Sequence, residues 1–230
     1  NELEEQEKNN KILKHSEYER KVYTFSDCAY IIYYFTENNL EKDFAKLFNT
    51  AASNTELLIL EFISNGFLVR GGVTLGDVYF EKQRSLFFGP AINTAYKIES
   101  TISNFPRIVI DDSLIEIIGN KNEELLNVFK AAGFNKEYYD NFLIEEGIGE
   151  IIKKDTDNYF YLNYLNLMQM GIGYQTKNGM DLLQLNDYCK AYTEKEINDL
   201  KNKIELTKEI DLQKKLEKIL IKQSWFYEYL

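Results

Sequence analysis

Three groups of residues in the first half of the chain have types and an order that could act on a phosphate. Asp27 stands at a polar interruption in a segment rich in Tyr, Ile and Phe. A glycine-rich segment begins at Arg70, and segment 89–99 then carries Asn93 and Lys97. On a helix, Asn93 and Lys97 would lie side by side because they are four residues apart. A carboxylate can hold Mg²⁺, and a nearby cation can stabilise charge that develops on phosphorus, so the groups together favour a metal-and-phosphate site.

Each group also has an ordinary structural interpretation. Asp is common in turns because its side chain bonds to the nearby backbone. An Asn/Lys pair is often a solvated helix face, and a strand arginine, such as Arg70 or Arg107, is often part of an ion pair even where it could reach a phosphate. Glycines at 71, 72 and 76 indicate that either another backbone or a ligand comes close. Only the combination and order of the three groups favour a metal-and-phosphate site over these structural roles.

Hydrophobic patterning predicts strands and helices in alternation, which is typical of an α/β chain arranged as an α+β sandwich. In the first part of the chain, the pattern predicts two strands over 21–35 joined by a tight turn at Ser26-Asp27, and then one or two helices over 40–64 that end at Gly66. A strand over 67–80, a helix over 90–102 and a strand over 107–111 follow. The rest is predicted to contain a mainly helical region over 113–150, a strand or buried helix over 159–165, and a long polar helical tail over 181–230.

Composition narrows the function classes. With 230 residues and 44% hydrophobic content, the chain can bury one core and carry a helical appendage. The formal net charge of −10 argues against a general nucleic-acid binder, since phosphate neutralisation needs a basic surface. No apolar run approaches the roughly 20 residues of a membrane helix. Cys28 and Cys189 show neither a zinc spacing nor a disulfide pattern, which favours the reducing cytoplasm, and the single His15 cannot form a His-based metal site.

The three motifs resemble a known family when they are taken together. "FSDCAYIIYYF", "RGGVTLG" and "GPAINTAYKIE" stand in the order and at the approximate spacing of the class III nucleotidyl cyclases, and are closest to the pyrimidine cyclases of bacterial Pycsar anti-phage systems. The resemblance covers roughly residues 20 to 112. It implies a cyclase-like fold with a ferredoxin-like central sheet flanked by helices, a catalytic domain over 1–180 and a helical C-terminal extension over 181–230.

The resemblance assigns Asp27 to the second metal carboxylate of a two-metal site that holds Mg²⁺ or Mn²⁺. The family's first carboxylate normally lies upstream, and nothing in residues 1 to 20 matches it. Because the sequence opens on Asn1 rather than Met, we expect that this segment lies before Asn1; the alternative is a degenerate homologue. An alternative assignment takes Asp27 as the first metal carboxylate and Asp77 as the second. It fits less well, because the helix that carries Asn93 would then follow the second carboxylate too soon.

Further roles follow from the resemblance for the helix that begins after Gly89. Asn93 matches the residue that orients the ribose, and Lys97 takes the place of a transition-state arginine. Lys keeps the positive charge but lacks the bidentate fork of Arg. Arg70 is a further candidate for binding the triphosphate. In the family, the Asn and cationic residues come from the opposite protomer, so a head-to-tail homodimer is implied.

The base preference is assigned to Tyr23 and Leu86. These residues correspond to the polar pair that selects adenine or guanine in purine cyclases. A bulky Tyr and an apolar Leu would narrow the pocket and deny a purine its hydrogen bonds, which favours a pyrimidine. The structural alternative is that Tyr23 is ordinary strand packing.

The resemblance therefore implies a nucleotidyl cyclase that converts the nucleoside triphosphate UTP or CTP into its 3′,5′-cyclic monophosphate and pyrophosphate in anti-phage defence, and we expect it to be cytoplasmic. No nucleic-acid or membrane partner is expected. The rival hypothesis is a non-catalytic, cyclase-like module that binds a nucleotide or a protein.

Overall fold

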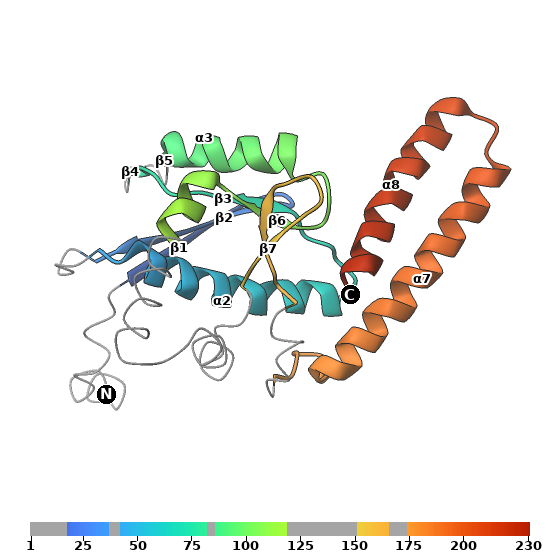
Figure 1. Ribbon diagram of the computed structural model, residues 1–230, viewed down its shortest axis with the longest axis horizontal. Coiled ribbons are helices and arrows are strands. Elements are labelled where there is room, and N and C mark those ends of the chain that lie inside the picture. The colour runs from blue at the N-terminus through green and yellow to red at the C-terminus, as the bar shows by residue number, and fades with distance from the viewer. Residues whose placement is uncertain (1–17, 37–41, 82–85, 119–150, 166–173) are drawn as a thin grey trace, which may run out of the picture. The chain divides into compact units, whose positions relative to one another are not determined.

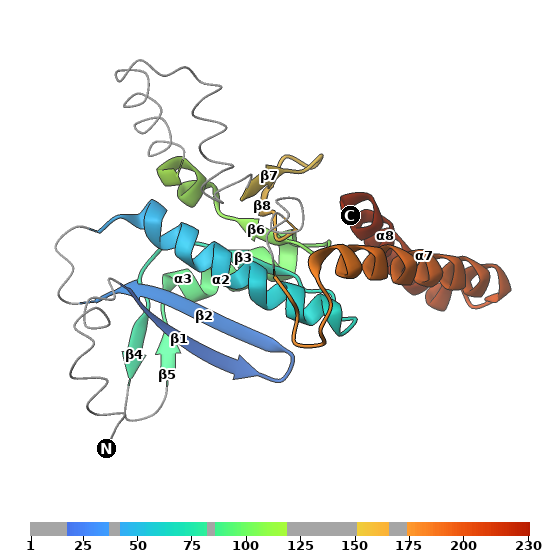
Figure 2. The ribbon, with the colours of Figure 1, turned by 90° about the horizontal axis from the view of Figure 1, so that it is seen from below.

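The computed structural model describes residues 18–36, 42–81, 86–118, 151–165 and 174–230 (Figures 1 and 2). The chain divides into two compact units, Asn1–Ala51 and Ala52–Leu230. The predicted helical region over 113–150 is described only as far as residue 118, and residues 112–118 are helical. The remainder of that region lies outside the described residues.

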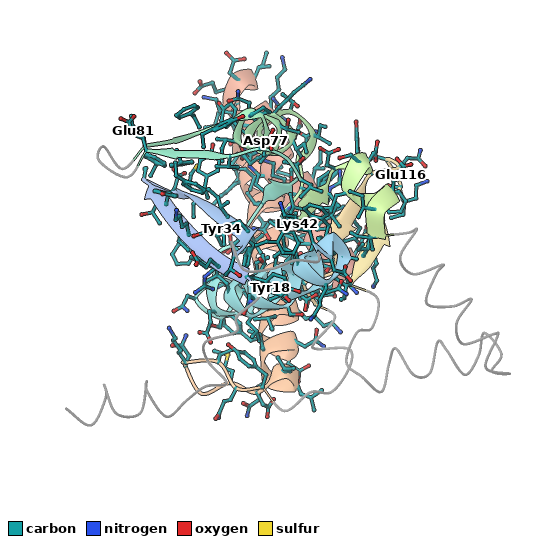
Figure 3. All side chains as sticks on the ribbon, turned by 90° about the vertical axis from the view of Figure 1, so that its left-hand side faces the viewer. Tyr18, Tyr34, Lys42, Asp77, Glu81 and Glu116 are labelled. Carbon is teal, nitrogen blue, oxygen red and sulfur yellow. The ribbon has the colours of Figure 1, made fainter. Side chains whose placement is uncertain are left out.

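A β-hairpin dominates the first unit. Strands β1 (Tyr18–Phe25) and β2 (Cys28–Phe35) are antiparallel, and the facing pair Phe25 and Cys28 closes a turn at Ser26-Asp27. Ser26 has a φ of 52°, which lies in the left-handed region that tight hairpin turns use. The Tyr34 hydroxyl donates to the Glu19 carboxylate on the facing strand, and Figure 3 labels Tyr34 on this hairpin. The predicted strand pair and its turn are confirmed.

Helix α2 (Phe44–Ser64) is one continuous helix, which settles the choice between one helix and two. Gly66, two residues after the end of the helix, has a φ of 81° and stops it, as predicted. The Gly66 amide donates to the Ile63 carbonyl, and the Phe67 amide donates to the Phe62 carbonyl. This pair of bonds is a Schellman motif, in which glycine accepts the left-handed backbone at no steric cost.

The second unit contains a small mixed sheet with the strand order β3-β6-β8-β7. Strand β3 (Gly71–Val73) is parallel to β6 (Ile108–Ile110), whereas β8 (Phe160–Leu162) is antiparallel to both β6 and β7 (Ile152–Lys154). The prediction left 159–165 open between strand and buried helix, and it contains a strand. The expected strand over 107–111 is also present.

The single strand predicted over 67–80 is wrong. The segment contains β3 and then β4 (Tyr79–Glu81), which pairs with β5 (Leu86–Phe88) in a separate two-stranded sheet. Between them the chain leaves the four-stranded sheet after Thr74, whose hydroxyl donates to the Asp111 carboxylate at 2.6 Å. Gly76 then passes close to Ala91 at the start of the next helix. Contact with this helix therefore interrupts the strand.

Helix α3 (Pro90–Lys97) continues directly into the π-helical segment η2 (Ile98–Ile102), which confirms a helix over 90–102. Pro90 occupies the first turn, where its missing N–H leaves no bond unmade. The predicted helical tail is also confirmed, but it forms two antiparallel helices, α7 (Leu182–Leu206) and α8 (Ile210–Tyr229) (Figure 1). A capping box between Asp181 and Gln184 begins α7.

Helices α2, α7 and α8 meet the end of the sheet in one hydrophobic core. Its buried members are Ile59, Leu60, Ile63, Tyr164, Leu165, Leu182, Leu185, Cys189 and Phe226. The mixed α+β class is confirmed, whereas the cyclase-type sheet and the domain boundary at residue 180 stay predictions. In the described segments, no helix combines the length and apolar character needed to cross a membrane.

Candidate functional site

Two glycines of the "RGGVTLG" segment, Gly72 and Gly76, lie against α3 and η2, whereas Gly71 lies against the Ile108 side chain of β6. A Cβ on Gly72 would lie 2.7 Å from the Ile98 Cβ and 2.8 Å from the Ala95 carbonyl oxygen. A Cβ on Gly76 would lie 3.4 Å from that of Ala91. The sequence left two explanations open for these glycines, a neighbouring element or a ligand. The close approach of α3 and η2 accounts for both Gly72 and Gly76.

Gly89 fixes the start of α3. Its φ is 149°, and a Cβ there would lie 2.4 Å from the Asp77 carbonyl oxygen. That oxygen accepts a hydrogen bond from the Ala91 amide at 3.4 Å, so the connection between β3 and β4 holds the first turn of the helix. Figure 3 marks Asp77 on this connection and Glu81 at the end of β4.

Asn93 and Lys97 both lie on the exposed side of α3, as their spacing predicts. The opposite side of the helix and η2 buries Ala91 and Ile98. The Asn93 backbone N–H donates to the Gly89 carbonyl, but within the part of the chain that the structure describes, neither the Asn93 side-chain amide nor the Lys97 ammonium group has a hydrogen-bond or ion-pair partner. The two groups are therefore free to contact a ligand.

Leu86 begins β5 and faces Glu81 across the two-stranded sheet. Its side chain is 49% exposed. The neighbouring rings of Tyr79 and Phe88 stack with centroids 5.6 Å apart and are also exposed. Leu86 thus belongs to an exposed apolar sheet that follows Asp77 and precedes α3.

Asp27 and Tyr23 belong to the hairpin of the first unit. The Asp27 side chain is exposed at the turn, and the Cys28 thiol lies 3.9 Å from its Oδ1. Tyr23 is partly exposed and faces Tyr30 on β2. These two residues share one unit, while Arg70, Leu86, Asn93 and Lys97 share the other.

Arg70 precedes β3 and forms an ion pair with Glu99 of η2 at 2.8 Å. The Arg70 side chain stays 43% exposed. The ion-pair interpretation of this arginine is therefore confirmed, and its open side remains accessible to an anion.

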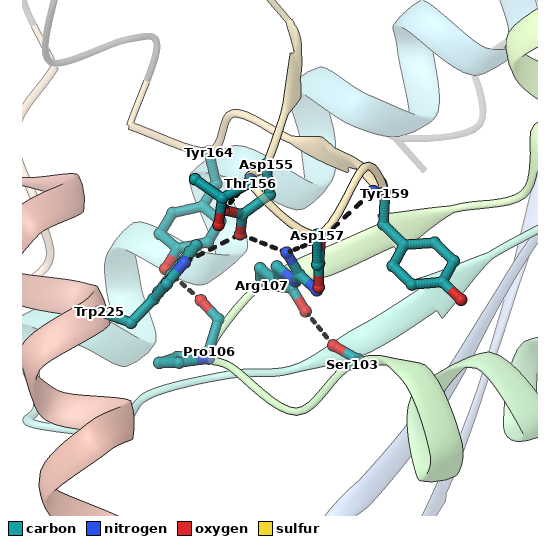
Figure 4. Close-up of polar contacts among 9 residues, drawn as sticks. All are labelled: Ser103, Pro106, Arg107, Asp155, Thr156, Asp157, Tyr159, Tyr164 and Trp225. Carbon is teal, nitrogen blue, oxygen red and sulfur yellow. Dashed lines mark hydrogen bonds and ion pairs between the residues drawn. The ribbon is translucent and has the colours of Figure 1, made fainter.

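Arg107 lies in a buried polar cluster that links the sheet to α8 (Figure 4). Its side chain is fully buried and pairs with the carboxylates of Asp155 and Asp157. The Trp225 indole N–H of α8 donates to Asp155 at 2.9 Å, and the Ser103 hydroxyl donates to the Arg107 carbonyl at 2.6 Å. The ion-pair interpretation is confirmed here too, and this arginine has no exposed surface to offer a phosphate.

Burial acts to raise the pKa of Asp157, but the hydrogen bond from Arg107, together with backbone N–H donors, outweighs it and lowers the pKa. Asp157 therefore stays ionised beside the guanidinium group. The cluster has a structural role, because its charges compensate one another inside the fold.

Sequence reasoning missed Glu56, a buried carboxyl group on α2. Its side chain is 1% exposed, and its Oε1 has no hydrogen-bond partner among the described residues. Burial raises its pKa to about 8. One signal was present: Glu56 lies between Ala52 and Ile59 on the stripe of α2 that faces the core.

The chemistry of the donor groups decides whether a divalent metal could be held. Asp27 offers an exposed carboxylate, the ligand type that Mg²⁺ and Mn²⁺ prefer. Among the described residues no group of three or more His, Cys, Asp or Glu side chains could hold a metal ion. Mg²⁺ is commonly held by one or two carboxylates plus substrate phosphates, so Asp27 fits one position of such a site.

Comparisons of the chain with protein-family models, curated proteins and solved structures give no match.

Proposed function

We propose that the chain is a metal-dependent nucleotidyl cyclase that acts on a pyrimidine nucleoside triphosphate, UTP or CTP. The proposal rests on the order of three motifs that resemble the class III cyclases and their Pycsar branch. One observation carries it furthest: Asn93 and Lys97 lie together on the exposed side of a helix whose other side packs on the glycine strand. We propose accordingly that the fold is cyclase-like, that the protein is cytoplasmic, and that it acts in phage defence.

The proposed reaction forms a bond between the ribose 3′-oxygen and the α-phosphorus and breaks the bond from that phosphorus to the leaving pyrophosphate. The 3′-hydroxyl proton passes to solvent. Asn93 would orient the ribose by hydrogen bonding, and the Lys97 ammonium group would stabilise negative charge on the α-phosphate. Asp27 would hold Mg²⁺ or Mn²⁺, which when bound neutralises triphosphate charge and lowers the pKa of the 3′-hydroxyl. Arg70 would contact a phosphate through its exposed side, and Tyr23 and Leu86 would border the base.

The first test measures the reaction directly. Purified protein is incubated with ATP, GTP, CTP or UTP and Mn²⁺, and products are identified by mass spectrometry. We expect a cyclic pyrimidine monophosphate that is lost in Asp27→Ala and kept in Asp187→Ala, which removes a carboxylate that is also exposed, on α7. Absence of product from all four nucleotides would favour the rival, a cyclase-like binding module without activity.

A mixing experiment tests the proposed head-to-tail homodimer. If each active site takes Asp27 from one protomer and Lys97 from the other, Asp27→Ala should be inactive alone and Lys97→Met should keep only about 1% of the wild-type rate. A mixed dimer then contains one site in which both residues are intact. Activity should therefore reappear on mixing, and two variants that stay inactive together would contradict a shared site.

A further inference from the structure

A groove of about 180 Å³ lies in the second unit, between the segment that leads into β3, the loop that precedes β6, and α8. None of the proposed cyclase residues except Arg70 lines it. The residues that decide its chemistry are Leu68, Phe105 and Ile219, which are apolar, and Arg70, Lys222 and Gln223, which are polar.

The apolar part of the groove contains an aromatic ring, Phe105, which Trp225 and the Arg107 guanidinium group hold in place. The Phe105 ring stacks on Trp225 with centroids 5.6 Å apart and planes 15° from parallel. The Trp225 indole is in turn held by its hydrogen bond to Asp155. An aromatic ring fixed in this way favours a planar apolar ligand, which can lie against it in an offset or edge-on geometry.

The polar part of the groove is cationic in a chain whose formal net charge is −10. Lys222 is exposed and has no ion-pair partner among the described residues. Arg70 adds a second positive charge; it pairs with Glu99, but its side chain remains 43% exposed and accessible to an anion. The lining residues include no Asp or Glu.

Gln223, which also lines the groove, carries an unsatisfied polar atom. Its Oε1 is buried and has no hydrogen-bond partner within the described segments. A buried acceptor without a donor is costly, so a ligand or water that supplies an N–H or O–H group is favoured there.

We propose that this groove binds a small molecule that joins a flat apolar ring system to a carboxylate or phosphate group. The anion pairs with Lys222 and shares Arg70 with Glu99, while the rings lie against Phe105 and Ile219. This inference does not depend on cyclase activity. It does connect the groove to the proposed site, because Glu99 belongs to η2, which continues the helix that carries Lys97.

The test uses 2-naphthoate as the probe and uncharged 2-naphthamide as its isosteric control. Trp225 is the only tryptophan, so the ¹⁵N-labelled protein gives a single indole N–H resonance that reports on the ring beneath Phe105. We expect 2-naphthoate to shift this resonance and the amide resonances of the groove residues, with saturation below about 5 mM. The amide should bind about tenfold more weakly, because it lacks the charge-assisted bond to Lys222.

Two variants separate the proposed site from a general electrostatic effect. Lys222→Gln should weaken 2-naphthoate binding about tenfold, whereas Lys201→Gln, the same change at an exposed position on α7, should leave it unchanged. Equal affinity for both probes, equal affinity of the two variants, resonance shifts located elsewhere, or no shift at the highest concentration would each overturn the proposal. Inorganic phosphate and benzoate then distinguish recognition of the anion alone from recognition of the rings.

Discussion

Glu56 is a buried acidic residue. Its Oε1 has no hydrogen-bond partner among the described residues. Its pKa rises from 4.5 to about 8 because burial penalises the charged carboxylate. At pH values between these two pKa values, the Glu56 carboxyl group is protonated in the folded state and ionised in the unfolded state. By linkage, this residue makes the fold less stable as pH rises from about 4.5 to about 8.

Replacing Glu56 with Gln removes this titration. We expect Glu56→Gln to gain stability relative to the wild type as pH rises from about 5 to about 8, by on the order of 2 kcal/mol. Urea unfolding at both pH values measures the difference. Glu194→Gln, at an exposed position on α7, is the matched control and should show no such trend. A stability difference that is the same at both pH values would contradict the assignment.

Lys97 provides a second prediction at the residue scale. Under the proposed function, Lys97→Met should lower the cyclase rate by about 100-fold, because transition-state charge then lacks its cation. Lys97→Arg should keep or raise the rate, since Arg restores charge and adds a bidentate fork. Because the side chain is exposed, thermal unfolding should not change in either variant. A Lys97→Met enzyme with wild-type kcat would remove this residue from the mechanism.

At the scale of elements, the contact between β3 and the helix α3–η2 depends on Gly72. Gly72→Ala would bring a methyl group within 2.7 Å of Ile98, so the helix must move. We expect a loss of about 1–3 kcal/mol, the usual cost of overpacking. Gly76→Ala is the matched control, because its methyl group would meet Ala91 at 3.4 Å. Equal losses in the two variants, measured by chemical unfolding, would show that helix packing is not the reason for Gly72.

The Arg107 cluster joins three elements, and its two carboxylates differ in exposure. Asp155 is 10% exposed and also accepts the Trp225 indole bond, whereas Asp157 is 37% exposed. We therefore expect Asp155→Ala to destabilise by about 3 kcal/mol, because it leaves a buried guanidinium group and indole N–H short of partners. The loss in Asp157→Ala should be smaller, since water can replace that carboxylate. Unfolding followed by Trp225 fluorescence compares the two, and the reverse order would contradict the cluster as described.

At the scale of the whole molecule, the helical tail and the sheet share a core. Leu185 and Cys189 of α7 and Phe226 of α8 are buried with Leu60 of α2. A protein that ends at residue 180 should therefore lose cooperative unfolding and aggregate, because this apolar surface is exposed to water. Calorimetry and size-exclusion chromatography of the shortened and full chains provide the comparison. A shortened chain that is monomeric and melts cooperatively would show that the predicted boundary at residue 180 separates independent domains.

The sequence predicted correctly those features that depend on residues close together in the chain. The hairpin turn at Ser26-Asp27 and the exposed pair Asn93 and Lys97 follow from turn residues and helical spacing, and both are present. The burial of Arg107 could not be predicted, because its partners are 48 and 50 residues away in the sequence. The interrupted strand over 67–80 depends on contacts with α3, which strand propensity does not encode. The relation of Asp27 to Lys97, on which the proposed chemistry depends, stays a prediction.

The hydrogen bonds of Tyr229 have a consequence for biosynthesis. Its hydroxyl donates to Asn163 and accepts from the Leu165 amide, 66 and 64 residues earlier in the chain. Since α8 also supplies Phe226 to the core, the buried side of α2 lacks its cover until the last turn of α8 has left the ribosome. During translation, the nascent second unit therefore exposes the apolar side of α2 until α8 has been synthesised, and such exposed surface is prone to aggregation.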